Sequence, residues 1–115
     1  MKCMVVILRE KKKSKYHSKK VVLDGIEFDS KKEADRYVQL LLMQRGGDIV
    51  GLKVHPRFEL AINHMKICAY EADFSYFDKR CLKQIVEDTK GYRTRAYRIK
   101  KKLMLAIHGI DVKEV

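Results

Sequence analysis

The sequence has few cysteines, no cysteine pair spaced for a metal and no long apolar run. Cys3, Cys68 and Cys81 are odd in number and form no CxxC motif, which indicates neither a disulfide framework nor a structural zinc site. No apolar stretch approaches the roughly 20 residues that a membrane-spanning helix needs. The short apolar run at residues 4–8 precedes basic residues, the reverse of the order in a signal peptide. We therefore expect a cytoplasmic protein that makes no membrane contact.

Acidic residues are also scarce relative to basic ones. The 115 residues include 26 Lys and Arg against 15 Asp and Glu, a net charge of +11 at neutral pH. Such a surplus is unusual for an enzyme acting on neutral metabolites and favours a polyanionic partner, of which nucleic acid is the commonest. The length predicts one domain with a modest core.

The first half of the chain predicts a hairpin followed by a helix. Asp24-Gly25 is typical of a tight turn between strands, which places a hairpin at residues 21–28. Ser30 is a helix N-cap, and Glu33 completes a capping box. Gly46-Gly47 ends the helix, and its buried face is predicted from the helical spacing of Ala34, Tyr37, Val38 and Leu41.

A series of strands follows the first helix. Residues 49–55 and 57–60 are strand-like on either side of Pro56, the single proline, which indicates an edge or a bulge because it has no amide proton. Asn63-His64 forms the next turn. Residues 67–77 then alternate as one strand with an apolar face, and residues 78–81 turn the chain into a strand at 82–90. The members of that apolar face are Tyr70, Ala72, Phe74 and Tyr76.

Two carboxylates and a lysine come together on this hairpin. Asp88 and Lys90 share a strand face, whereas Glu87 points away. A loop of two or four residues would put Asp73 on the same side, and a loop of three would not unless a bulge intervened. Neighbouring carboxylates repel, and Mg²⁺ resolves that conflict with oxygen ligands. A solvated face with a weak ion pair remains the alternative interpretation of an Asp-x-Lys pattern.

The last third predicts a second helix and a closing strand. Thr94 caps the helix, Gly109 ends it, and residues 110–115 alternate as a strand. The predicted buried stripe consists of Ala96, Ile99, Leu103 and Ile107. Basic residues crowd the first half of the helix without an acidic residue at i±4, so we expect contact with a phosphate backbone.

Three short strings carry a resemblance to a known group of proteins. They are Lys31-Lys32-Glu33-Ala34, Tyr70-Glu71-Ala72-Asp73-Phe74 and Val86-Glu87-Asp88-Thr89-Lys90-Gly91-Tyr92. An Asp followed by a strand-borne Asp-x-Lys resembles the PD-(D/E)xK nuclease superfamily, with Ala72 standing where the Pro of that name would be. Within it, the strings look like a small phage-associated family of nuclease-like domains suspected of acting like Holliday junction resolvases.

The resemblance implies a fold and domain limits. The expected fold is α/β with a restriction-endonuclease-like core: a helix, three strands, a helix and a strand, in a mixed central sheet flanked by helices. Residues 15–115 would form this nuclease-like domain. Residues 1–14 lie outside the likeness and are expected to be a basic N-terminal arm or an added strand; the basic cluster at residues 11–20 suits DNA contact and a solubilising tail equally.

The resemblance also implies roles for individual residues. Asp73 and Asp88 would hold Mg²⁺, with Mn²⁺ as a substitute, aided by Glu33 and the backbone carbonyl of Thr89, while Lys90 would steady the attacking water or phosphate. Glu33 is equally well explained as a helix cap. The expected DNA contacts are Lys19, Lys20, Lys31, Lys32, Arg93, Arg95, Arg98 and Lys101.

The resulting hypothesis is a metal-dependent DNA endonuclease acting on duplex or branched DNA such as Holliday junctions. Symmetric junction cleavage would require a homodimer, and the resemblance suggests a phage or prophage gene product acting in the bacterial cytoplasm. The main alternative is a non-catalytic basic nucleic-acid-binding module; an RNA nuclease is a second one. The sequence leaves open the DNA structure cut, the number of metals, the oligomeric state and the role of residues 1–10.

Overall fold

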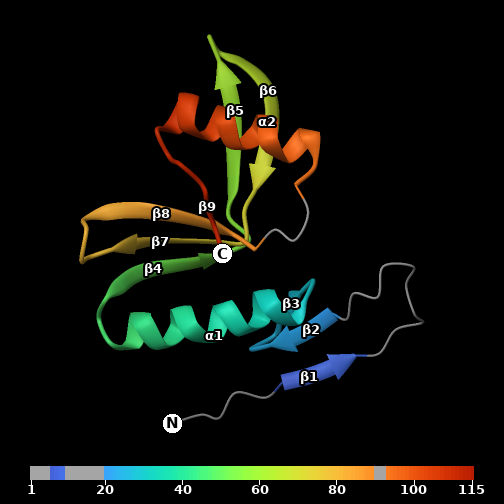
Figure 1. Cartoon of the computed structure of the whole chain (residues 1–115), viewed down its shortest axis with the longest axis vertical. Helices are drawn as coiled ribbons and strands as arrows, with labels where there is room; N and C mark the ends of the chain where they lie inside the picture. The colour runs from blue at the N-terminus through green and yellow to red at the C-terminus, as the bar shows by residue number, and fades with distance from the viewer. Residues whose placement is uncertain (1–5, 10–19, 90–92) are drawn as a thin grey trace. The chain divides into compact units, whose positions relative to one another are not determined.

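The computed structural model describes residues 6–9, 20–89 and 93–115, and their contacts divide the chain into two compact units, residues 1–40 and 41–115. Figure 1 shows the elements along the chain. In chain order they are β1 (Val6–Arg9), β2 (Lys20–Leu23), β3 (Ile26–Phe28), α1 (Lys31–Arg45), β4 (Ile49–Val54), β5 (Arg57–Ile62), β6 (Met65–Glu71), β7 (Phe74–Asp78), β8 (Lys83–Asp88), α2 (Arg95–Leu103), the π-helical turn η1 (Met104–His108) and β9 (Lys113–Glu114).

The first unit contains a three-stranded antiparallel sheet in the order β1-β2-β3. The tight turn between β2 and β3 is confirmed: Asp24 and Gly25 have φ of 51° and 77°, the positive dihedrals that a primed turn requires. Val21, Leu23 and Phe28 are buried on one side of this sheet. Strand β1 pairs with β2 along its whole length.

Helix α1 begins in the first unit and ends in the second, at the residues that the sequence predicts. The Ser30 hydroxyl accepts a hydrogen bond from the Glu33 amide at 3.1 Å, which confirms Ser30 as the N-cap. Gly47, with φ of 87°, follows the last turn. The buried face differs from the prediction, because Val38 and Leu41 are only half-buried whereas Leu40 is buried.

The second unit contains a mixed four-stranded sheet in the order β4-β7-β8-β9. Strands β4, β7 and β8 pair antiparallel and lie side by side in Figure 1, whereas β8 and β9 pair in parallel. The expected α/β class with a mixed sheet and two helices is therefore confirmed. Among the described residues, no helix is both long and apolar enough to cross a membrane.

The prediction of one continuous strand over residues 67–77 is wrong. The chain leaves β6 at Glu71 and enters β7 at Phe74, and the two strands belong to different sheets. The segment that pairs with them breaks at the same level, between β4 and β5. There the His55 amide donates to the Asp73 carbonyl at 2.9 Å, and the Pro56 carbonyl accepts from the Ala72 amide at 3.0 Å. The two paired segments, β4–β5 and β6–β7, therefore bend at the same place, where they pass from one sheet to the other.

The second helix is capped as predicted but buries a different stripe. Thr94 Oγ1 accepts from the Tyr97 amide at 3.1 Å, and Gly109 ends η1 with φ of 69°. Ala96 and Ile99 are exposed, Ile99 by 52%, so their assignment to the core is wrong. Tyr97 and Met104 are buried instead, because the tyrosine hydroxyl has a polar partner and the π-helical turn shifts the register of the following residues.

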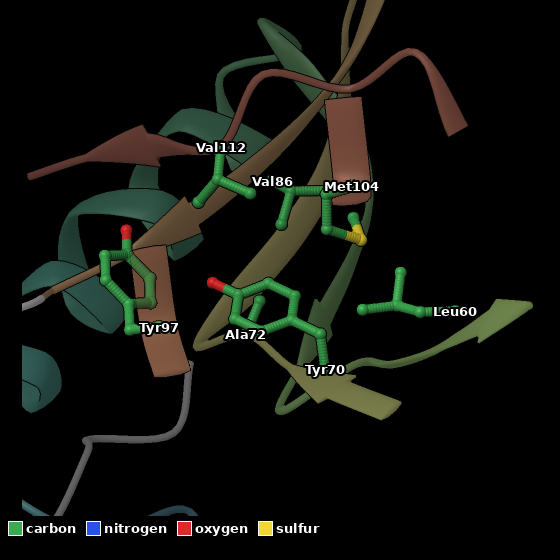
Figure 2. Close-up of a cluster of buried hydrophobic side chains, with 7 residues drawn as sticks. All are labelled: Leu60, Tyr70, Ala72, Val86, Tyr97, Met104 and Val112. Carbon is green, nitrogen blue, oxygen red and sulfur yellow. The ribbon is translucent and has the colours of Figure 1, made fainter. Parts of the chain in front are cut away.

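The core of the second unit lies between the sheet, the β5–β6 hairpin and the second helix. Figure 2 shows its buried side chains, which are Leu60, Tyr70, Ala72, Val86, Tyr97, Met104 and Val112. Leu103 and Ile107, two members of the predicted stripe, pack against this cluster as half-buried residues. Strand β9 is shorter than the closing strand expected at residues 110–115, but its neighbour Val112 anchors it in the core.

Candidate functional site

Asp73 and Asp88 lie at the open end of the β7–β8 hairpin, where Asp73 contacts Thr89, the residue that follows Asp88. The connection consists of the four residues 79–82, the even length that was expected to put the two carboxylates on one side. The paired register ends with Phe74 opposite Glu87, and Asp73 and Asp88 are the residues next to this last pair. The Asp73 amide donates to the Glu87 carbonyl at 3.1 Å, which continues the pairing beyond the last residue of β7.

The half-buried Asp73 carboxylate is fixed by Thr89. Its Oδ2 atom accepts two hydrogen bonds, from the Thr89 amide at 2.6 Å and from the Thr89 hydroxyl at 2.7 Å. Bonds to an ionised carboxylate are shorter and stronger than those between neutral groups. Because a carboxylate offers about four lone-pair positions, Asp73 retains acceptor capacity for a further ligand.

Asp88 is 1% exposed, and its carboxylate accepts a hydrogen bond from the Tyr70 hydroxyl. Burial raises the pKa of Tyr70 far above its ordinary value, and the hydrogen bond to Asp88 and the charges of Asp88 and Asp73 raise it further. The phenol therefore stays neutral and remains a donor. Both carboxylates therefore lie close enough to the Tyr70 hydroxyl for their negative charges to affect its pKa.

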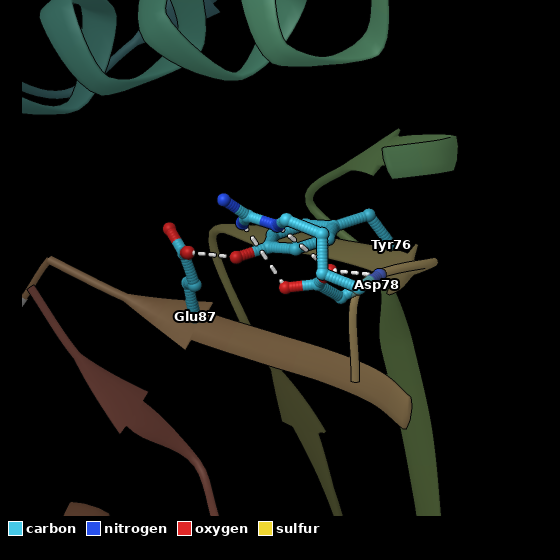
Figure 3. A network of polar contacts seen from close by, with 4 residues as sticks. Tyr76, Asp78 and Glu87 are labelled. Carbon is cyan, nitrogen blue, oxygen red and sulfur yellow. Dashed lines mark hydrogen bonds and ion pairs between the residues drawn. The ribbon is translucent and has the colours of Figure 1, made fainter. Parts of the chain in front are cut away.

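Glu87 is fully buried on the opposite face of β8 from Asp88, which agrees with the alternation predicted for this strand. Figure 3 shows its carboxylate accepting from the Tyr76 hydroxyl, next to Asp78 on the same hairpin. Asp78 accepts from the Arg80 amide at 2.9 Å and from the Arg80 side chain at 3.1 Å, and these bonds lower the pKa of Asp78. The Asp78–Arg80 contacts close the turn of the β7–β8 hairpin.

The structure tests the roles of the other predicted catalytic residues only in part. Glu33 is buried in the first unit, whereas Asp73 and Asp88 belong to the second, so its approach to them stays a prediction. Thr89 is half-buried at the end of β8, and the role of its carbonyl as a ligand also stays a prediction. Lys90 and the DNA-contact residue Lys19 lie outside the described residues.

The predicted DNA-contact residues are mostly exposed. The exposed members are Lys31, Lys32, Arg93, Arg95 and Arg98, while Lys20 and Lys101 are half-buried. Two of these cations have acidic partners from the C-terminal segment: Arg93 pairs with Glu114 at 2.5 Å, and Lys101 approaches Asp111 at 4.0 Å. The absence of acidic residues at i±4 in the helix is therefore partly offset by contacts that are distant in sequence.

Glu114 links the basic surface to the core. Its Oε2 atom accepts from the buried Tyr97 hydroxyl at 2.8 Å while Oε1 faces Arg93. The bond from Tyr97, together with the charges of Lys101 and Arg93, lowers the pKa of Glu114. Burial and the same bond raise the pKa of Tyr97. The ring of Tyr97 in turn lies 6.3 Å from that of Tyr70, between centroids.

The chain matches one protein family over nearly its whole length. The family model is described as "Protein of unknown function (DUF1064)" and covers residues 13–114. The chain belongs to this family. Searches of the curated proteins and of the solved structures found no match.

For this DUF1064 chain, sequence reasoning missed the tyrosine partners of the carboxylates and the role of Glu114. One signal was available, since Tyr70 and Tyr76 occupy positions of an apolar strand face where Phe would pack equally well. A buried phenol needs an acceptor, and two acidic residues of β8, Asp88 for Tyr70 and Glu87 for Tyr76, provide it. The pairing of Tyr97 with Glu114 had no such signal because the two residues are joined only through tertiary packing.

Proposed function

We propose that the protein is a metal-dependent DNA endonuclease with Asp73 and Asp88 at its centre. The observation that carries this proposal is that the two carboxylates lie at the same end of the β7–β8 hairpin, each held by a neutral donor, Thr89 for Asp73 and Tyr70 for Asp88. Neutral donors orient carboxylates without cancelling their charge. Such an arrangement suits a cation better than it suits a purely structural ion pair.

The donor set fits Mg²⁺. Its members are oxygen atoms, and Mg²⁺ is commonly bound through one or two carboxylates while it keeps several waters. Asp73 and Asp88 would hold the ion, with the Thr89 carbonyl and Glu33 as further candidate ligands and with Mn²⁺ as a substitute. When bound, the ion would polarise a phosphodiester for hydrolysis. Lys90, close in sequence to Asp88, would steady the water or the phosphate.

The order of elements supports a restriction-endonuclease-like core. Helix α1, strands β4, β7 and β8, helix α2 and strand β9 follow the order helix, three strands, helix, strand. The β5–β6 hairpin is inserted between the first two of these strands and forms its own two-stranded sheet. The parallel pairing of β9 with β8 is consistent with the crossover that α2 makes between them.

The charge of the protein supports DNA as the substrate. The surplus of +11 and the exposed cations of α2 suit a phosphate backbone. Branched DNA, a Holliday junction above all, is the substrate we propose, and two symmetric cuts in a junction would require a homodimer.

The test is cleavage of labelled four-way junction, linear duplex and single-stranded DNA with Mg²⁺, Mn²⁺ or chelator. Asp88→Asn should lower cleavage at least about 100-fold, because the metal supplies several kcal/mol of transition-state stabilisation. Glu87→Gln is the matched control: it neutralises the adjacent buried carboxylate on the opposite face of the same strand. Its rate per folded molecule should stay near that of the wild type.

Two results would contradict the proposal. If Glu87→Gln abolishes cleavage while Asp88→Asn retains it, the centre is not on the Asp73–Asp88 side of the hairpin. If the wild type binds DNA and cuts no substrate with either metal, the protein is a non-catalytic nucleic-acid-binding module, the alternative that the exposed cations of α2 favour.

A further inference from the structure

A groove of about 420 Å³ lies between α2 with its η1 extension and the C-terminal segment, within the second unit. Four cations line it: Arg93, Arg98, Lys101 and Lys102. Arg95, on the same helix and equally exposed, is not among the lining residues. The groove therefore divides the basic residues of α2 into those that face it and those that do not.

The cations that line the groove are unequal. The carboxylates of Glu114 and Asp111 are ion-pair partners of Arg93 and Lys101, respectively. Among the described residues, no ion pair involves Arg98 or Lys102. The uncompensated positive charge of the groove is thus concentrated on two side chains.

Arg98 and Lys102 are four residues apart and share one face of the helix, where like charges repel by a few tenths of a kcal/mol. An anion lying between them would remove this repulsion. Leu105, also lining the groove and 53% exposed, follows three residues later on the same side. An apolar wall beside two cations suits a phosphate that carries a sugar better than it suits a free inorganic ion.

We propose that this groove seats one phosphate group of a nucleic-acid strand between Arg98 and Lys102, with the attached sugar against Leu105. The inference rests on the proposed function and adds to it a defined anchor for the strand on α2. Arg93 and Lys101 keep their carboxylate partners and shape the two ends of the groove. Arg95 and Lys100 contribute only general electrostatic attraction.

The test compares two double variants of equal charge. Arg98→Gln with Lys102→Gln removes the seat, whereas Arg95→Gln with Lys100→Gln removes the same charge from the same helix outside the lining residues. Gln has a helix propensity close to those of Arg and Lys, so both variants should fold, which circular dichroism checks. Binding of a labelled duplex is measured in chelator over a range of salt concentrations, where neither metal nor cleavage contributes.

The groove variant should bind about tenfold more weakly, and the slope of log affinity against log salt should become shallower by about 1, the loss of one neutralised phosphate. The control should also lose affinity, but only about twofold to threefold, because it removes part of the general attraction of the helix and no bound phosphate. A deoxynucleoside monophosphate should compete at lower concentration than inorganic phosphate with the wild type and with the control, and this difference should vanish in the groove variant.

Equal losses of affinity in both variants would show that Arg98 and Lys102 form no specific phosphate site and that the binding is diffuse electrostatic attraction. Unchanged affinity in the groove variant, with wild-type cleavage intact, would refute the groove while the endonuclease proposal survived. Equal competition by the nucleotide and inorganic phosphate would refute the contact of the sugar with Leu105. A wild type that binds no DNA would instead remove the proposed function together with this inference, so the two failures are distinguishable.

Discussion

Replacing Tyr70 by Phe isolates the hydrogen bond that holds Asp88. Tyr70 is 3% exposed, and its hydroxyl donates to Asp88 Oδ2 while its ring packs in the core cluster. Phe keeps the ring and its contacts and deletes one donor. Because burial and Asp88 keep the pKa of Tyr70 well above neutral, the wild-type phenol donates throughout the pH range in which the protein can be assayed.

The expected loss follows from the kind of bond removed. A hydrogen bond to a charged acceptor contributes about 1.5–3 kcal/mol, so the free energy of unfolding should fall by about 2 kcal/mol. At about 4 °C per kcal/mol, the melting temperature should fall by about 8 °C. Mn²⁺ affinity, measured by electron paramagnetic resonance, should fall about tenfold, because residues that orient a metal ligand typically contribute that much. Unfolding is followed in urea with chelator present.

Tyr97→Phe is the matched control. Tyr97 is also buried in the core cluster, but its hydroxyl donates to Glu114, at 2.8 Å, rather than to Asp88. The control should lose stability and keep its Mn²⁺ affinity within about twofold. If Tyr70→Phe matches the wild type in stability and in Mn²⁺ affinity, the bond to Asp88 has no role. If both variants bind Mn²⁺ equally poorly, general loosening of the core explains the effect instead.

Two further predictions concern the C-terminal part of the chain. Gly109→Ala should lower the free energy of unfolding, measured in urea, by about 1–2 kcal/mol, because φ of 69° is a left-handed conformation that Ala disfavours. No atom lies within 4 Å of the added Cβ, so the cost comes from the backbone conformation and not from a clash. An unchanged midpoint would show that the helix end relaxes freely. Because the bond from Tyr97 and the charges of Lys101 and Arg93 lower the pKa of Glu114, its stabilising contribution is present above the ordinary carboxyl pKa and is lost as pH falls through the lowered folded value. The wild type should therefore exceed Glu114→Gln in stability at neutral pH and converge with it in acid, and a difference independent of pH would contradict this mechanism.

The features that the sequence predicts correctly are those decided by neighbouring residues. Asp24-Gly25 forms its turn, Ser30 and Thr94 accept from the amides three residues ahead, and Gly109 ends the second helix. In each case one side chain, or the lack of one, settles the local dihedrals or satisfies a free amide. Such interactions span a few residues and are present in any context that lets the element form.

The features that the sequence could not supply depend on tertiary contacts. Alternation of buried residues continues across the junction of β6 and β7. Tyr70 of β6, Ala72 of the junction, and Phe74 and Tyr76 of β7 are all buried, although the two strands belong to different sheets. Alternation of apolar residues with a period of two indicates which residues are buried, but it does not indicate which sheet they join. The burial of Tyr97 in place of Ile99 likewise depends on Glu114, a partner 17 residues away.

The kink beside Asp73 explains how the Asp73 carboxylate is oriented. In a straight strand the regular pairing would continue through Asp73, and the chain would not bend there. Instead the ribbon bends where Pro56 accepts from Ala72 and where His55, with φ of 54°, donates to the Asp73 carbonyl. At the bend Asp73 is outside both strands, so its carboxylate can receive both donors of Thr89 while its amide still pairs with β8. The single proline lies at this bend, where an amide proton is not needed, and the chain there supports the carboxylate pair on which the proposed activity depends.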